Sequence, residues 1–357
     1  MYALLPLILF LGACVSSPPA QQAEAQQAES ESEFSYANGV QFLVAAKEDW
    51  RQKRNCVSCH TNGWGLAAMP AIDRKSKEVD VGRKFAQEYL KKYLDETVMP
   101  KGQHGSTEGM VATTAFLLMS DARSGNKMSK VSRQALDHAW KLLDESGTWE
   151  NWLQCNWPPY ESDAKFGPTL MLIAIGEIGS LAEIGDKDRG YVDRLCAYLK
   201  KNPPLSLHDK AMRIWAAKHW PGLLGKKSDR ATWLTELTQA QNADGGWSMA
   251  ALAGPAWKRD GGEEQTRTSE AYPTAFACYV LQQLQLAKAF DSAATGRQKA
   301  INRGLHWLMN HQQDDGSWFT RSPRRDGKHY ISRAATSFAL MALAKWRTDP
   351  IQYRERP

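Results

Sequence analysis

Residues 237–247 read LTQAQNADGGW, and residues 308–318 read LMNHQQDDGSW. The two stretches align without gaps at an offset of 71 residues and share leucine, glutamine, aspartate, glycine and tryptophan at matching positions. Such internal self-similarity is typical of a fold assembled from repeated helical units. We expect each glycine to end a helix in the left-handed conformation. The tryptophan would pack back with its indole N–H bonded, and the glutamine would bond an exposed helix end.

The pattern extends beyond these stretches, because Arg303-Gly304 precedes the second copy. Arg-Gly…Leu-x3-Gln-x3-Gly-x-Trp resembles the QW repeat of the terpenoid cyclase and prenyltransferase superfamily, which includes squalene–hopene cyclase. A fainter copy without the glutamine ends at Gly147-Thr148-Trp149. The resemblance covers residues 228–346 and implies a ring of paired helices, an α–α toroid.

Hydrophobic periodicity predicts twelve helices, which pair into six hairpins. The second helix of each hairpin tends to be apolar all round, and the first tends to be amphipathic. An inner ring and an outer ring satisfy both patterns, so we predict an all-α fold, an (α/α)6 toroid. The predicted helices span residues 36–50, 64–75, 82–97, 107–121, 129–145, 167–180, 189–201, 207–219, 228–241, 270–288, 298–312 and 333–346.

Residues 56–60 read CVSCH, the attachment signature of c-type haem. Two cysteines at this spacing can form thioethers with the haem vinyl groups, and the adjoining histidine can bind the iron. Cys56, Cys59 and His60 are therefore the predicted cofactor-binding residues, with haem c as cofactor. The alternatives are a redox-active cysteine pair or half of a zinc site.

The sequence does not identify the sixth iron ligand. Met69 is close to the motif, and Met99 precedes a proline at a distance that resembles small cytochromes. His104 and Met110 are further candidates, and an unfilled sixth position is an alternative.

The N-terminus predicts export. Residues 1–13 form a short apolar run typical of a signal peptide. Leu11-Gly12-Ala13-Cys14 resembles a bacterial lipobox, which predicts lipidation of Cys14. Residues 14–33 form a polar tether with little to bury. We expect a lipid-anchored protein of the periplasm or outer membrane.

The net positive charge suits an acidic partner or an anionic surface, and the alternative is a solvated basic surface with no specific role. The chain carries a formal charge of +6, and four glutamates in the tether leave about +10 for the remainder. Basic residues are dense at 47–54, 226–230 and 321–328. A redox partner protein is expected, and no nucleic acid.

The domain prediction is one toroid over residues 34–350 that includes the haem-attachment loop 54–70. The alternative is a separate small cytochrome c domain over residues 34–120, followed by a shorter helical domain.

The chemistry of the resembled superfamily is missing from the sequence. Class II cyclases use an Asp-x-Asp-Asp acid, and the chain contains none. Asp260, Cys278 and His329 are the residues that could imitate the zinc ligands of prenyltransferases, but their spacing does not favour it. Cyclisation and prenyl transfer are not expected.

Two functions follow from these features. The first is electron transfer through the covalent haem, with the toroid as scaffold. The alternative is a haem-dependent oxidoreductase that acts on an apolar isoprenoid or lipid substrate in the toroid cavity. A third hypothesis is a non-enzymatic binding module. The sequence assigns no catalytic residue.

Overall fold

The computed structural model describes most of one compact unit, residues 32–357. The predicted signal peptide, Cys14 and the tether lie outside the described residues. Within the described part, no helix is long and apolar enough to cross a bilayer. The described residues are 34–95, 106–149, 152, 157–160, 163–179, 184–224, 227–255, 257–283 and 292–348.

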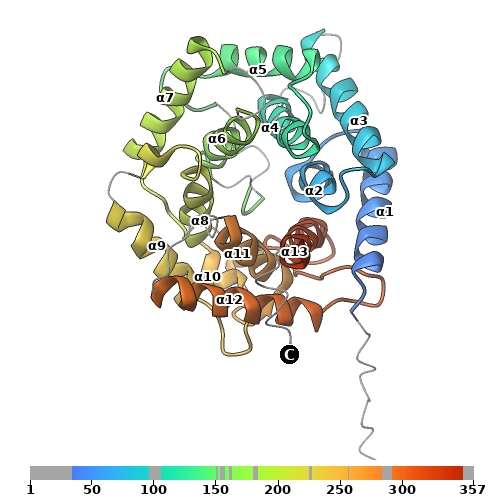
Figure 1. Cartoon of the computed structure of the whole chain (residues 1–357), viewed down its shortest axis with the longest axis vertical. Helices are drawn as coiled ribbons and strands as arrows, with labels where there is room; N and C mark the ends of the chain where they lie inside the picture. Colours follow the sequence, from blue (N-terminus) through green and yellow to red (C-terminus); the bar gives the residue numbers. More distant parts are fainter. Residues whose placement is uncertain are drawn as a thin grey trace, which may run out of the picture. The chain divides into compact units, whose positions relative to one another are not determined.

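In the part of the chain that the structure describes, twelve helices form two concentric rings (Figure 1). The outer ring contains α1 (Tyr36–Arg54), α3 (Lys77–Leu94), α5 (Lys130–Leu142), α7 (Asp186–Lys201), α9 (Lys227–Gln239) and α12 (Ser292–Met309). The inner ring contains α2 (Trp64–Ile72), α4 (Ser106–Ser124), α6 (Phe166–Ile178), α8 (Leu207–Ala216), α11 (Ala271–Gln283) and α13 (Ile331–Thr348). The predicted all-α toroid of six hairpins is confirmed.

The inner ring closes on itself. Each inner helix contacts the next, and α13, the last, contacts α2, the first. The remaining elements are short. They are the π-turn η1 (Cys59–Gly63), the 3-10 turns η2 (Pro221–Leu223) and η3 (Asp260–Gly262), helix α10 (Met249–Leu252), and strands β1 (Trp247–Ser248) and β2 (Ser269–Glu270). The two strands pair antiparallel, with Trp247 opposite Glu270.

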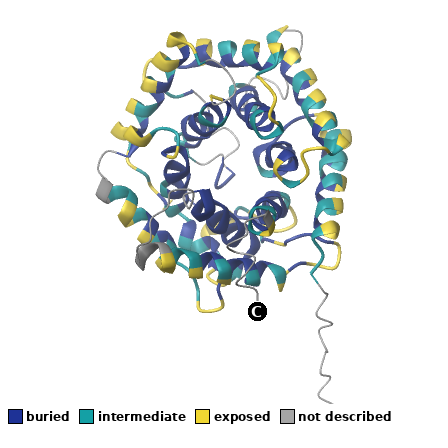
Figure 2. Cartoon of the chain, viewed as in Figure 1, coloured by how far each residue is buried: buried dark blue, intermediate teal, exposed yellow. Residues whose placement is uncertain are grey.

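Burial separates the rings in the way that the hydrophobic pattern predicts. Every side chain of α11 is buried, whereas α5 buries one face only. Figure 2 shows the inner helices as mostly buried and the outer helices as exposed on their outward side. Apolar inner helices therefore supply the core, and amphipathic outer helices shield it.

Serine side chains begin several helices. Ser35, Ser76, Ser129 and Ser206 each accept a hydrogen bond from a backbone N–H in the first turn of α1, α3, α5 and α8. Such caps satisfy donors that have no partner inside the helix.

The repeated sequence forms the same turn wherever it occurs. The indoles of Trp149, Trp247 and Trp318 donate to backbone carbonyls ten residues earlier, at 2.9, 2.8 and 2.7 Å. The preceding glycines 147, 245 and 316 all have positive φ, between 84° and 97°. The expected left-handed stop and bonded indole are thus present, even in the fainter copy.

Candidate functional site

The topology brings one end of every inner helix to the same face. Because the chain alternates between the two rings, the inner helices all run in one direction. Their N-terminal ends, with the loops that precede them, therefore share one face of the ring. Unpaired N–H groups at helix N-termini carry partial positive charge, so this face favours electron-rich groups.

Aromatic side chains meet where the inner helices converge. Trp64 of α2 lies 4.6 Å from the ring of Phe338 and 6.0 Å from that of Trp215. Tyr160, from the loop before α6, lies 5.9 Å from Tyr272. We call these side chains the aromatic cluster, and its members are Trp64, Phe116, Tyr160, Trp215, Tyr272, Phe276, Tyr279 and Phe338. Each of them is at most 6 % exposed.

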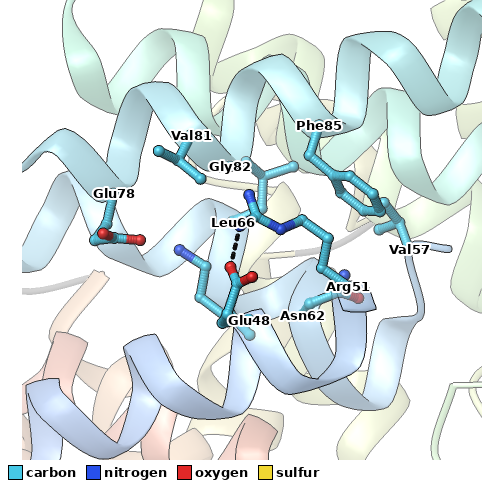
Figure 3. Close-up of a pocket in the computed structure, with 10 residues that line it drawn as sticks. Glu48, Arg51, Val57, Asn62, Leu66, Glu78, Val81, Gly82 and Phe85 are labelled. Atoms are coloured by element: carbon cyan, nitrogen blue, oxygen red, sulfur yellow. Dashed lines mark hydrogen bonds and ion pairs between the residues drawn. The ribbon is translucent and has the colours of Figure 1, made fainter. Parts of the chain in front are cut away.

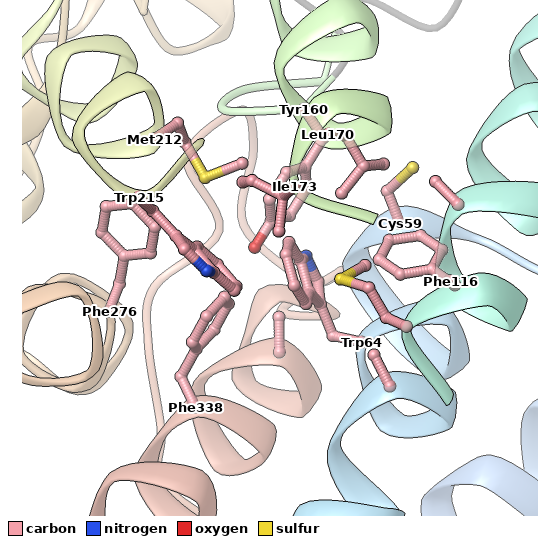
Figure 4. Packing of buried hydrophobic residues seen from close by; sticks show 14 of the residues in the cluster. Cys59, Trp64, Phe116, Tyr160, Leu170, Ile173, Met212, Trp215, Phe276 and Phe338 are labelled. Carbon is pink, nitrogen blue, oxygen red and sulfur yellow. The ribbon is translucent and has the colours of Figure 1, made fainter. Parts of the chain in front are cut away.

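Three buried polar atoms of the aromatic cluster make no hydrogen bond of normal geometry to the described residues. They are the indole nitrogens of Trp64 and Trp215 and the hydroxyl of Tyr160. The Tyr160 hydroxyl still interacts with the side chains of Tyr272 and Trp64. Figure 4 shows the Tyr160 hydroxyl between the indoles of Trp64 and Trp215. A buried donor without a partner costs free energy, so three that converge mark a place for an acceptor.

A histidine–tyrosine pair borders the aromatic cluster. His208 Nε2 lies 2.8 Å from the hydroxyl of Tyr272, and the His208 ring stacks on Phe276 at 4.3 Å. Burial lowers the pKa of His208 to about 3, and burial raises the pKa of Tyr272 well above its usual value. Both groups are therefore neutral near pH 7, and they share a buried hydrogen bond.

A pocket with about 260 Å³ of atom-free space, part of it open to solvent, reaches His208 from the side of α6 and α8. Asp209 lines it and pairs with Arg213 at 2.8 Å, which anchors the first turn of α8. Burial raises the pKa of Asp209. The other lining residues are Pro159, Asp163, Phe166, Thr169, Ser206, His208, Met212 and Trp257.

A second carboxyl lies at the N-terminus of α11. Glu270 is 9 % exposed, and its Oε1 accepts the N–H of Arg321 at 2.9 Å. Its Oε2 is buried, with no partner within hydrogen-bond distance in the described residues. Burial raises the pKa of Glu270 to about 7, so it holds a proton over a wide pH range.

The predicted haem residues lie at the start of α2. Cys56 and Cys59 are 3 % and 4 % exposed, with Ser58 in extended conformation between them. Figure 4 shows Cys59 beside Phe116. The His60 ring stacks between Trp157 at 5.6 Å and Tyr330 at 5.9 Å.

This packing does not fit a bound haem in the described conformation. Both thiols are covered by side chains of the hydrophobic core. His60 Nε2 lies 3.3 Å from the Ser58 hydroxyl, so the ring turns back on its own loop. A haem would have to displace Trp157 or Tyr330 and reorient His60. We therefore derive no chemical step through haem.

The predicted distal ligands are not brought to His60. Met69 is fully buried near the other end of α2, nine residues from His60. Met110 is buried in α4. Met99 and His104 lie outside the described residues.

The three residues considered as zinc ligands, Asp260, Cys278 and His329, each have other surroundings. Cys278 is fully buried in α11, Asp260 contacts Arg324, and His329 Nδ1 accepts the N–H of Ser322. Among the described residues, no group of three or more His, Cys, Asp or Glu side chains could hold a metal ion.

Two side chains of this site carry no signal in the sequence. No motif marks His208, which is 3 % exposed inside the ring. Tyr160 follows two prolines and belongs to no periodic pattern. Its position follows from the loop that carries it inward.

Comparisons with known proteins identify the fold. No protein-family model matches the chain, and no curated protein matches its sequence. A type II terpene cyclase, MstE from Scytonema, matches in structure with a TM-score of 0.52 and 14 % identity, over 87 % of this chain and 98 % of that one. Unsaturated glucuronyl hydrolase from Bacillus sp. GL1 matches with a TM-score of 0.54 and 10 % identity, over 88 % of this chain and 97 % of that one. A polysaccharide lyase matches with a TM-score of 0.51 and 12 % identity, over 89 % of this chain and 99 % of that one.

These findings correct the predicted function. The proteins that share the ring are a terpene cyclase, a glycan hydrolase and a lyase, and none of the three is a cytochrome. The prediction of a haem electron-transfer protein, and its alternative of a haem oxidoreductase, are wrong on this comparison. The packing around Cys56 and His60 agrees with the correction. The chain is similar to these proteins in fold, which is the α–α toroid.

Proposed function

We propose that the protein binds a small, largely apolar molecule with one hydrogen-bond-accepting oxygen inside the aromatic cluster. The observation that carries the proposal is a group of three buried polar atoms in one cluster, from Trp64, Trp215 and Tyr160, that make no hydrogen bond of normal geometry to the described residues. An ether, hydroxyl or carbonyl oxygen at their centre would satisfy them. Ligand pockets commonly combine apolar walls with a few convergent polar groups.

The chemistry of the walls limits the ligand class. Aromatic faces from α2, α4, α8, α11 and α13 surround the donors, and the charged groups nearby are paired or held neutral. Burial of a polyhydroxylated sugar here would leave many hydroxyls without partners. An isoprenoid or lipid-like alcohol, with a single oxygen, suits the cluster better.

Matched ligands test the proposal. Farnesol carries an oxygen that its hydrocarbon analogue farnesene lacks. Quenching of tryptophan fluorescence should report both, because Trp64 and Trp215 lie in the cluster. We expect farnesol to bind about tenfold more tightly, as one buried hydrogen bond permits. Tyr160→Phe should remove most of that difference and leave farnesene binding unchanged.

Tyr191→Phe is the control, because Tyr191 stacks on Trp140 in the outer ring, away from the cluster. It should change neither affinity. Equal binding of both ligands by the unaltered protein, or an effect of Tyr191→Phe as large as that of Tyr160→Phe, would count against the proposal.

A second candidate is proton transfer on a uronate-containing oligosaccharide. The specific observation is the neutral His208–Tyr272 pair, 2.8 Å apart, beside a pocket on a ring that a polysaccharide lyase shares. Incubation with polyuronates would reveal lyase action as the ultraviolet absorbance of an unsaturated product. Absence of this product, or its persistence in Tyr272→Phe, would exclude the pair from such a reaction.

Attachment of haem to Cys56 and Cys59 stays a prediction from the sequence alone, and the proposed function does not depend on it. Extraction of the purified protein with acidified acetone tests it. Haem that remains with the polypeptide, and is lost in the double variant Cys56→Ala, Cys59→Ala, would support attachment. A colourless protein after expression with the c-type maturation machinery would contradict it.

We also propose, from the sequence alone, that the protein is anchored to a membrane by a lipid. The support is the lipobox-like segment that ends at Cys14, which lies outside the described residues. Metabolic labelling with a fatty acid should mark the unaltered protein and not Cys14→Ser. Labelling of both, or of neither, would contradict the prediction.

A further inference from the structure

A pocket separate from the aromatic cluster lies between α1, α3 and the segment that leads into α2 (Figure 3). It holds about 380 Å³ of atom-free space, part of it open to solvent. Its walls are mainly apolar, from Val57, Leu66, Val81 and Phe85. The polar lining residues are Lys47, Glu48, Arg51, Asn62 and Glu78.

Lys47 is the unusual member of this lining. Its Nζ is buried, and it has no hydrogen-bond partner among the described residues. Two glycines make room for its side chain. A Cβ on Gly65 would lie 2.9 Å from Lys47 Cδ, and one on Gly82 would lie 3.6 Å from Nζ. The pocket therefore has room for the amine, but no described side chain forms a hydrogen bond with it.

The other charged groups of the pocket do not supply a counterion bond. Glu48 pairs with Arg51 on α1, as Figure 3 shows. Glu78 on α3 acts on Lys47 only through its charge. The residues of α2 and η1 that line the pocket are uncharged. Burial lowers the pKa of Lys47 to about 8, against the opposing influence of Glu78.

We propose that Lys47 is the reactive amine of a second site, which binds a small aldehyde with an apolar body covalently as an imine. A desolvated lysine in an apolar pocket is a better nucleophile than an exposed one, because more of it is uncharged at neutral pH. The apolar walls would hold the body of the aldehyde, with its carbonyl carbon toward Nζ.

The step balances without an oxidant or a reductant. The nitrogen lone pair attacks the carbonyl carbon, a C–N bond forms, and the carbonyl oxygen takes a proton. Nitrogen then loses its protons, the hydroxyl leaves as water, and a C=N bond forms. Amine and aldehyde thus give imine and water. Glu78, which lines the pocket, is the group placed to carry the proton.

Reductive trapping tests the site in the full-length protein. Benzaldehyde with sodium cyanoborohydride near pH 7 converts the imine to a stable secondary amine, which peptide mass spectrometry locates. Lys53 is the internal reference, because it lies on the same helix with its side chain 73 % exposed. We expect Lys47 to react at least about tenfold faster than Lys53, because desolvation favours the uncharged, nucleophilic form of a buried amine.

Two variants separate reactivity from folding. Lys47→Arg keeps the positive charge without the nucleophile. Lys47→Met keeps the volume and removes an unpaired buried amine, so it should fold at least as well as the unaltered protein. Both should lose the fast labelling, while Lys53 labels as before. Labelling of Lys47 less than tenfold faster than Lys53, or fast labelling that survives in Lys47→Met, would overturn the proposal. Neither outcome bears on farnesol binding by the aromatic cluster.

Discussion

At the scale of single residues, burial favours the uncharged forms of two ionisable side chains of the ring. Burial lowers the pKa of His208 to about 3 and raises that of Glu270 to about 7. Transfer of a charge from water to such an environment is costly, so the group shifts its pKa instead. The interior therefore offers neutral donors and acceptors, which suit a ligand without charge.

Glu270→Gln should reveal this shift as a pH-dependent gain in stability. Because the folded pKa of about 7 exceeds the unfolded value of 4.5, the contribution of the carboxyl is most favourable below pH 4.5. It is lost as the pH rises through about 7. The glutamine oxygen can still accept the Arg321 N–H. We expect the variant to be more stable by roughly 2–3 kcal/mol near pH 8, with no gain near pH 4.

Urea denaturation at the two pH values measures the effect. Glu264→Gln is the control, because its side chain is 70 % exposed, and it should change stability at neither pH. If Glu270→Gln gains no more stability over the unaltered protein near pH 8 than near pH 4, the pKa of Glu270 is not raised in the folded protein.

At the scale of elements, the tryptophan turn locks each hairpin of the repeated region. Trp247 and Trp318 are fully buried, and their indoles donate to Leu237 and Leu308 at the ends of the preceding outer helices. Thr274 and Thr336, on the inner helices, accept the backbone N–H groups of the same tryptophans at 2.8 and 3.1 Å. The turn thus ties an outer helix to its inner partner.

Trp247→Ala and Trp318→Ala should each lower the free energy of unfolding by roughly 3–5 kcal/mol, because each change leaves a large cavity and an unpaired carbonyl. Chemical denaturation followed by circular dichroism measures the loss. Trp233→Ala, on the partly exposed side of α9, should cost much less. Similar losses at all three positions would mean that the turn has no special role.

At the scale of the whole described unit, one glutamine joins the last hairpin to the first. Gln312, after α12, accepts the N–H of Ser35 at 2.8 Å and donates to the Ser35 carbonyl at 2.9 Å, across 277 residues of sequence. Arg333 of α13 pairs with Asp49 of α1 at 3.0 Å. Gln241 makes the corresponding bond to Ala300 of the next outer helix, so the same device links neighbours and closes the ring.

Gln312→Ala should therefore loosen the closure without disrupting any single hairpin. We expect a loss of roughly 1–3 kcal/mol, from two broken long-range hydrogen bonds. Hydrogen exchange should accelerate most at the start of α1. Gln313→Ala is the control, since Gln313 is exposed. Uniform acceleration over all helices would contradict a local role at the closure.

Removal of the first two hairpins should have a larger effect. A chain that begins at residue 122 lacks α2 and α4, so α13 and α6 lose their inner-ring neighbours and expose apolar faces. It should aggregate or melt without a sharp transition, whereas a chain that begins at residue 34 should melt as the full-length protein does. A folded monomer with a sharp transition from residue 122 would favour the alternative of two domains.

The sequence by itself determined the helices and their order. Residues such as Gly245 and Trp247 act within one hairpin, so a local pattern is enough to predict the turn. Apolar and amphipathic periodicities likewise predict which helix of a pair is buried. The twelve predicted ranges agree with the observed helices. At most of the helix ends that the structure describes, the difference is a few residues.

Only the tertiary structure decided what the interior can bind. No local motif marks His208, but Tyr272, 64 residues later, makes it a buried neutral partner. The CVSCH stretch predicts haem chemistry, yet Trp157 and Tyr330 surround its histidine from distant parts of the chain. Closure of a ring joins side chains that share no local pattern. Their burial, and hence their charge state and partners, follows from packing that the sequence does not display.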